Sequence, residues 1–287
     1  MALQPFREEQ LNYFRFAYLV IDEFPKALRQ SFRSMWDNNV GHLPGHKLWD
    51  DSTAVRNLFL VTEGGKTRVP IHLSFYEWDC TALFQATIYA RTFALPDSKG
   101  RISTLSELYV KSRKLPHGKF HVSVKSPGGN NAETFSLSID QLRLLRNSIC
   151  HKPSAEIDKM TFDQWVQHAK NAFEALGIAT RPIDTIRVMT EADFPTEKVR
   201  TLEEDIRKAS QAENRFLREE VEDRLSDIAR SIQELQDGLK RLEAEREEQF
   251  RSLNDKLKEE LRNTSEKSKE KSEVRPREVT ERTTLGN

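Results

Sequence analysis

The chain has 287 residues, of which 37% are hydrophobic and 31% are charged, so it is more polar than a wholly globular protein. Its 45 basic and 45 acidic residues cancel, which excludes a protein whose overall field attracts nucleic acid. No run reaches the roughly 18 apolar residues of a membrane span, and no N-terminal signal is visible. Two cysteines are too few for a disulfide framework, so we expect a cytoplasmic protein without membrane contact.

The first part of the chain, residues 8–178, contains four apolar patterns at helical spacing. The predicted helices span residues 10–38, 74–93, 138–151 and 161–176. Pro25 predicts a kink or break near Phe24, and Gly177 is typical of the residue that follows a helix end. Four amphipathic helices predict an all-α four-helix bundle with long inserted loops. We interpret four aromatic residues as core rather than as base-stacking residues: Trp36, Trp49, Trp78 and Trp165.

The third predicted helix ends in a short stretch that contains an arginine, an amide and a histidine. At about 100° per residue, Asn147 and His151 share one face of that helix, beside Arg146. Pro153 cannot continue the helix, so His151 lies in the last turn, where the helix dipole favours its cation. Such a set could bind a phosphate group. The alternative is that His151 caps the helix and Arg146 lies on a solvated face.

The connection before this helix is rich in basic residues and has few acidic ones. Its candidate nucleic-acid-binding residues are Lys111, Arg113, Lys114 and Lys119. A basic stretch can follow the phosphates of a nucleic-acid backbone, and it can equally be a solvated loop. The alternation of apolar and polar residues over 119–124 also indicates a short strand.

The last part of the chain shows apolar residues at alternating spacings of three and four, which is the pattern of a coiled coil. This apolar seam comprises Leu225, Ile228, Ile232, Leu235, Leu239, Leu242, Phe250, Leu253, Leu257 and Leu261. We predict a linker over 179–200, a coiled coil over 201–263 and a disordered tail over 264–287, where apolar residues almost vanish. The alternative is a single solvated helix that is rich in ion pairs.

The seven histidines do not fall in metal-ligand spacing with carboxylates. The chain also lacks the cysteine pairs that a zinc site needs. We therefore expect neither a metal site nor another cofactor.

These features resemble the HEPN domain, an all-α nucleotide-binding bundle of higher eukaryotes and prokaryotes, over roughly residues 8–178. The resemblance is closest to the branch found in a DAZ-interacting RNA-binding ubiquitin ligase and in many invertebrate multidomain proteins. The segments that carry it are Asn12-Tyr13, Ala27-Leu28-Arg29 with Phe32, Trp78 to Leu83, Leu145-Arg146-Asn147 with His151, Phe162 with Trp165, and Ala175-Leu176-Gly177. No RING finger is visible, so the resemblance does not imply ubiquitin-ligase activity.

In HEPN ribonucleases an Arg-polar-x3-His motif carries the activity, and it maps here onto Arg146, Asn147 and His151. The resemblance implies that His151 transfers protons, a role typically worth about 10²–10⁴-fold in rate. Arg146 would pair with the phosphate, and Asn147 would orient the histidine or hold a phosphate oxygen. Cleavage would need no metal and would leave a 2′,3′-cyclic phosphate. Family members form such sites by dimerising.

Two functions therefore stay open. The first is an RNA-directed HEPN module, as a metal-independent endoribonuclease or as a binder of single-stranded RNA. The second is a non-catalytic scaffold that assembles protein partners through its bundle and coiled coil. Both predict a homodimer, formed through the bundle, the coiled coil or both.

Overall fold

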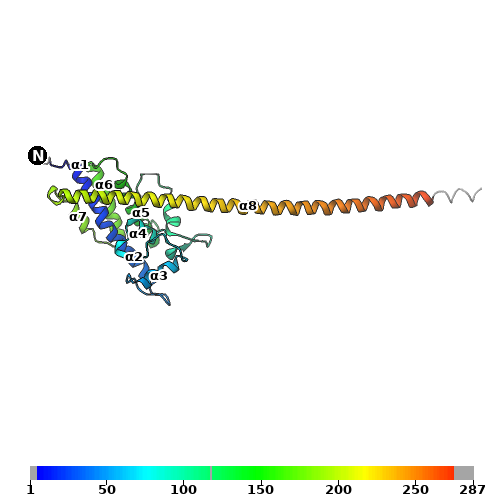
Figure 1. The fold of residues 1–287 in the computed structure, drawn as a ribbon, viewed down its shortest axis with the longest axis horizontal. Coiled ribbons are helices and arrows are strands. Elements are labelled where there is room, and N and C mark those ends of the chain that lie inside the picture. Colours follow the sequence, from blue (N-terminus) through cyan, green and yellow to red (C-terminus); the bar gives the residue numbers. More distant parts are fainter. Residues whose placement is uncertain (1–4, 117, 275–287) are drawn as a thin grey trace, which may run out of the picture. The chain divides into compact units, whose positions relative to one another are not determined.

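The computed structural model describes residues 5–116 and 118–274 (Figure 1). These residues are mostly helical, with one two-stranded sheet, which confirms the all-α class. The chain divides into two compact units, one that ends at Arg218 and one that begins at Glu219.

The N-terminal helix changes to a π-helical segment just before its proline, where the sequence predicts a kink or break. Helix α1 spans Glu8–Tyr18, a π-helical segment spans Leu19–Glu23, and α2 spans Phe24–Asn39. Pro25 lies in the first turn of α2 and can donate no backbone hydrogen bond to the preceding turn. The π-turn before Pro25 accommodates the proline, since the backbone keeps right-handed helical angles on both sides of the junction.

The region after α2 contains more short elements than the sequence indicates. Helix α3 spans Thr53–Thr62, within a segment predicted to be a loop. The prediction of one helix over 74–93 is wrong, because a 3-10 turn spans Phe75–Glu77 and α4 only Cys80–Ala86. A further 3-10 turn spans Arg91–Phe93. Two residues set the start of α4. Trp78 has an extended backbone, and the Asp79 side chain caps the helix by accepting a hydrogen bond from the N–H of Ala82.

The connection from α4 to the next long helix contains a small hairpin. Strands β1 (Leu95–Pro96) and β2 (Ile102–Ser103) pair antiparallel, with Leu95 opposite Ser103. A π-turn at Ser106–Val110 and a 3-10 turn at Lys111–Arg113 follow. The strand predicted over 119–124 is absent from the described part of this connection, because that segment lies against α5 through side-chain contacts.

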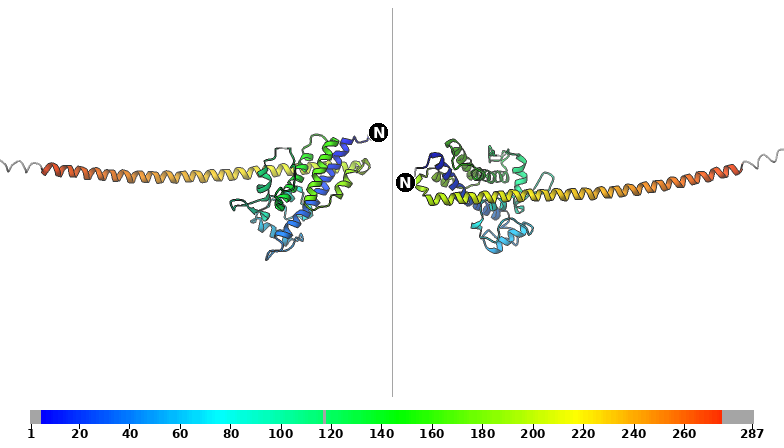
Figure 2. Two further views of the ribbon diagram at one scale, coloured as in Figure 1. Left: turned by 180° about the vertical axis from the view of Figure 1, so that it is seen from behind. Right: turned by 45° about the horizontal axis from the view of Figure 1, so that its top comes forward.

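Helices α5 (Asn131–Cys150) and α6 (Lys159–Ala175) pack along each other, and α6 also packs against α1 (Figure 2). Both helices begin before their predicted starts at residues 138 and 161. Asn130 caps α5 by accepting from the N–H of Glu133, and Asp158 caps α6 by accepting from that of Thr161. Gly177 has φ of 71°, which confirms the predicted glycine after α6.

The segment predicted as a linker is folded onto the first unit. It forms α7 (Arg181–Arg187) and a 3-10 turn at Glu191–Asp193, and it buries Ile183 and Phe194. Helix α8 then spans Thr196–Val274. Its start, residues 196–218, belongs to the first unit, and it adds Leu202, Ile206 and Phe216 to the buried residues.

An aromatic cluster forms the centre of the first unit's core. The ring of Phe32 is fully buried, and its centroid lies between 4.6 and 6.4 Å from those of six other aromatic residues. These are Trp36, Trp49, Phe59, Phe75, Trp78 and Phe93. All four tryptophans are buried, as predicted.

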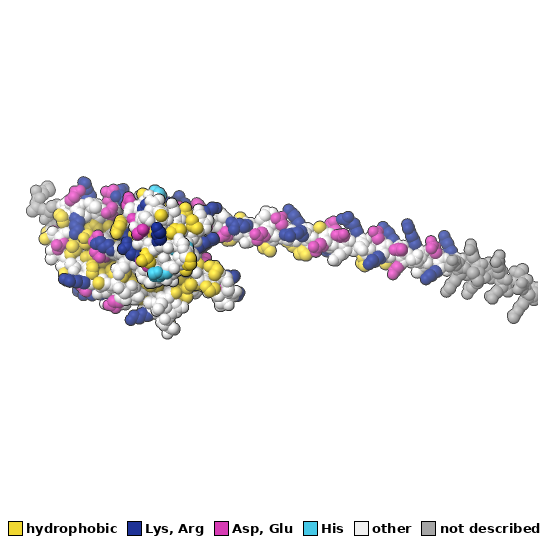
Figure 3. All heavy atoms as spheres, turned by 90° about the horizontal axis from the view of Figure 1, so that it is seen from below, with side chains coloured by type: hydrophobic (Ala, Val, Ile, Leu, Met, Phe, Trp, Pro, Cys, Tyr) yellow, Lys and Arg dark blue, Asp and Glu magenta, His cyan; other side chains and the backbone are white. Residues whose placement is uncertain are grey.

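The second unit is the remainder of α8, from Glu219 to Val274. Its apolar seam residues are between 50 and 71% exposed, and Figure 3 shows apolar side chains at the surface between charged ones. The helix includes residues 264–274, which were predicted to be disordered. The rest of that predicted tail, residues 275–287, lies outside the described residues.

Candidate functional site

Helix α5 holds Arg146 in the interior rather than on a solvated ridge. One side of α5 packs against the core through Leu142, Leu145 and Ile149. Arg146 lies next to these residues, and only 1% of its surface is exposed. A buried guanidinium needs both a counter-ion and hydrogen-bond acceptors. The start of α8 supplies the counter-ion.

The carboxylate of Glu213, which is fully buried, is that counter-ion. Its Oε2 lies 2.7 Å from Arg146 Nη1, and its Oε1 accepts from Asn147 Nδ2 at 2.9 Å and from Arg143 Nη1 at 3.2 Å. Arg146 Nη2 donates to Thr81 Oγ1 at 2.8 Å and to the carbonyl oxygen of Ala209 at 2.5 Å. Two predicted site residues, Arg146 and Asn147, are thus brought together on one carboxylate.

The same network continues to a buried histidine. Arg143 Nε donates to Asp140 Oδ1 at 3.0 Å, and His121 Nε2 lies 2.8 Å from Asp140 Oδ2. The backbone N–H of His121 donates to Gln141 Oε1 at 2.9 Å, which fixes this loop on α5. The chain of contacts therefore links the connection before α5, helix α5 itself and the start of α8.

The electrostatics of this network favour the charged forms of Asp140 and Arg143. Burial raises the pKa of Asp140, but the hydrogen bond from His121 and the charge of Arg143 outweigh it, so the pKa is lowered overall. Burial lowers the pKa of Arg143, but the influence of Tyr89, Asp140 and Glu213 raises it overall. Asp140 is therefore ionised near neutral pH, and His121 Nε2 is the donor of their hydrogen bond.

His151 lies apart from this buried network. It is the C-terminal cap of α5, its side chain is exposed, and its backbone N–H donates to the carbonyl oxygen of Asn147 at 3.1 Å. The position agrees with the predicted last turn. The arrangement leaves His151 at the surface while Arg146 is sealed by Glu213, so RNA cannot reach both side chains in this conformation.

The four basic candidates of the connection before α5 are all exposed. Arg113 forms an ion pair with Glu133 at 2.6 Å, and Lys111 Nζ lies 5.9 Å from the centre of the Tyr89 ring. Lys114 has a left-handed backbone with φ of 47° at the end of its 3-10 turn, and Lys119 lies further along the same connection. Glu133 thus neutralises part of the predicted basic surface.

Sequence reasoning missed Glu213, although the start of α8 contains a signal for it. The positions of this segment that are buried or half-buried against the first unit follow spacings of four and three residues, and Glu213 occupies one of them. The series is Leu202, Ile206, Ala209, Glu213 and Phe216. A lone carboxylate within such a stripe predicts a buried cationic partner.

The two cysteines are poor nucleophiles. Burial raises the pKa of the Cys80 thiol to about 12 and that of Cys150 to about 11. Within residues 5–116 and 118–274, no group of three or more His, Cys, Asp and Glu side chains could hold a metal ion.

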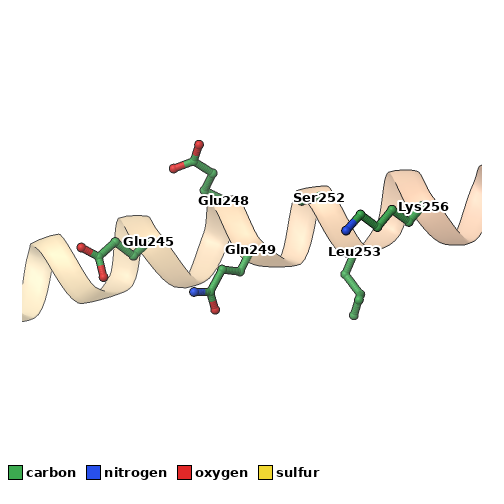
Figure 4. A pocket seen from close by; sticks show the side chains of 6 residues that line it. All are labelled: Glu245, Glu248, Gln249, Ser252, Leu253 and Lys256. Atoms are coloured by element: carbon green, nitrogen blue, oxygen red, sulfur yellow. The ribbon is translucent and has the colours of Figure 1, made fainter.

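A shallow depression lies on the second unit (Figure 4). Its lining residues are Glu245, Glu248, Gln249, Ser252, Leu253 and Lys256. All six come from α8, so this surface is open to solvent and is not an enclosed binding site.

No helix among the described residues is both long enough and apolar enough to cross a membrane. The chain matches no family model, and no curated protein or solved structure matches it.

Proposed function

We propose that this chain is a non-catalytic interaction protein whose last helix brings copies of the chain together. The observation that supports this is the exposed apolar seam, whose ten residues are at least half exposed. Full burial of one such side chain contributes about 1.5–3 kcal/mol. Pairing along the seam therefore has a large driving force.

The alternative of a single solvated helix has weaker support. Ion pairs do follow the helix, such as Arg224 with Glu220 at 2.7 Å and Arg251 with Glu247 at 3.4 Å. Exposed pairs of this kind contribute only about 0.3–0.5 kcal/mol each. They stabilise the helix against fraying, but they do not offset the cost of leaving the seam in water.

The state of Arg146 also favours an interaction protein. A catalytic arginine must contact its substrate, whereas Arg146 is buried and ion-paired with Glu213 inside the first unit. Its contacts hold the start of α8 on α5, which is a structural role. In this proposal the second unit self-associates, and each chain brings one copy of the first unit to the assembly.

Replacing Ile232 and Leu239 together by aspartate should abolish self-association. Two charges in the seam would have to be buried in any paired state, so we expect the dissociation constant to rise at least about 100-fold. Light scattering of the purified chain at micromolar concentration measures this directly. The wild type should show a multiple of 33.3 kDa and the variant a single chain mass.

The matched control places the same two charges on the far side of the helix, at Gln233→Asp and Ala244→Asp. This variant should keep the mass of the wild type. A wild type that stays at 33.3 kDa throughout would contradict the proposal. Equal dissociation of both variants would show that added charge, and not the seam, controls association.

A second candidate is the RNA-directed HEPN function, and one observation favours it. Arg143, Arg146 and Asn147 converge on a single carboxylate, which is a set of donors that suits any oxyanion, phosphate included. Since Glu213 fills this position, RNA would have to displace the start of α8 from α5. His151, at the end of the same helix, would then be available for proton transfer.

His151→Ala tests the second candidate without disturbing the core, because the side chain is exposed. The wild type and this variant are incubated with labelled single-stranded RNA in EDTA. If the chain is a ribonuclease, the wild type should release fragments with 2′,3′-cyclic phosphate ends, and the variant should lose about 10²-fold or more of that rate. Intact RNA in the wild-type reaction, or equal rates for both proteins, would exclude the catalytic function.

A further inference from the structure

The apolar seam of the second unit is interrupted near its middle by Arg246. Seam positions run through Leu239 and Leu242, and the next position on that side of α8 is Arg246, followed by Phe250. Between 242 and 250 the spacing is four and four instead of three and four. This shift is a stutter, which changes the local winding of a coiled coil.

The intervals between seam positions are the same when they are counted forward from Ile228 and backward from Leu257. Counted forward from Ile228, the next seam positions follow after four, three and four residues, at 232, 235 and 239. Counted backward from Leu257, they also follow after four, three and four, at 253, 250 and 246. A copy of the helix that runs in the opposite direction therefore meets a matching series.

We propose that two copies of α8 pair antiparallel along the apolar seam, with Ile228 of one copy opposite Leu257 of the other; this inference rests on the proposed self-association. In this alignment Ile232 lies opposite Leu253 of the second copy, and Leu235 opposite its Phe250. In these three layers an apolar residue packs against an apolar partner, as knobs into holes require.

The interruption itself separates the two orientations. A parallel pair in register places Arg246 against Arg246 of the second copy, within the seam. The antiparallel pair places Arg246 against Leu239 of the second copy instead. The aliphatic stem of arginine can cover that leucine while its guanidinium reaches water, so the antiparallel arrangement avoids a repulsive layer.

Charge along the helix favours the same orientation. Residues 219–237 contain seven carboxylates and two basic residues, whereas the stretch that the antiparallel alignment sets beside them, 248–266, contains five carboxylates and four basic residues. A parallel pair would bring the acidic stretch against its own copy. The antiparallel pair sets it beside a nearly neutral one, which lowers the repulsion.

The side chains around Leu253 fit a helix-binding face. Figure 4 shows Leu253 and Gln249 on one side of α8, with Glu248 on the opposite side. The exposed charge of Glu248 thus points away from the side that the proposal assigns to the second copy.

Disulfide trapping distinguishes the two orientations in the full chain. Ile228→Cys and Leu257→Cys are made as separate variants, with a small affinity tag on one of them, and are oxidised alone and as a mixture. Along one helix these positions lie about 44 Å apart. A disulfide needs Cα atoms within about 7 Å, so each variant can bond only to the position that it faces.

If the pair is antiparallel, the mixture should form a disulfide between a tagged and an untagged chain. Each variant alone should form none. Wild-type chain is the control for Cys80 and Cys150, which burial makes unreactive. Cross-linking of each variant to itself would overturn the antiparallel orientation and leave self-association standing. If the chain is oligomeric but no disulfide forms in either variant or in the mixture, the alignment of Ile228 with Leu257 would be overturned. A single chain mass by light scattering would overturn the proposed function as well.

Discussion

Glu213→Gln should destabilise the first unit by about 3–5 kcal/mol, the effect expected when one partner of a buried ion pair is removed. The glutamine keeps the shape of the side chain, but it leaves the buried charge of Arg146 without a counter-ion. Urea unfolding followed by tryptophan fluorescence measures the change. All four tryptophans lie between residues 36 and 165, so the signal reports the first unit.

Glu197→Gln is the matched control, because it makes the same change at an exposed position of α8 whose ion pair with Arg200 is solvated. Its effect should stay below about 1 kcal/mol. A second comparison replaces both Glu213 and Arg146 by methionine, which removes the charges together and should recover most of the lost stability. A loss in Glu213→Gln no larger than that of the control would show that the buried pair is dispensable.

Phe32→Ala should also lower the stability of the first unit by about 3–5 kcal/mol. The ring is fully buried and touches the aromatic cluster on several sides, with centroids 4.6 Å from Trp49 and 5.3 Å from Phe75. The cavity that alanine leaves cannot be filled by these rigid rings without moving α2. Calorimetric unfolding measures the effect.

Tyr76→Ala removes a similar aromatic ring from a position that is 67% exposed, directly after Phe75 in the chain. It should change the stability by about 0.5 kcal/mol or less. Similar losses from the two variants would mean that the cluster around Phe32 does not form the core of the unit.

The sequence predicts helices well where an apolar stripe and its stop signals coincide. The π-turn before α2 lies where Pro25 predicted a kink or break, and Gly177 correctly predicted the end of α6. Proline fixes φ, and glycine permits the positive φ of a helix end. Helix α3 was missed because its stripe is short and lies between glycine- and proline-rich stretches. The predicted helix over 74–93 was too long, because the caps at Ser74 and Asp79 divide it.

The candidate site shows a different limit. Helical spacing correctly set Arg146 beside Asn147, but it could not reveal that a segment more than sixty residues later covers them. The face of a helix follows from local sequence, whereas its partner depends on the tertiary fold. The lone carboxylate of Glu213, within an otherwise apolar stripe, is the sequence feature from which a buried cation beneath the start of α8 could have been predicted.

That carboxylate also limits how the start of α8 can slide along the first unit. A slip by seven residues in one direction would move Glu213 into the apolar site of Ile206, where its charge has no partner. A slip in the other direction would set Ile206 against Arg146 and leave the guanidinium without an anion. The apolar residues alone distinguish these alignments less sharply, since Leu202, Ala209 and Phe216 lie seven positions apart. The single charged position therefore makes one alignment of this helix far more stable than its neighbours.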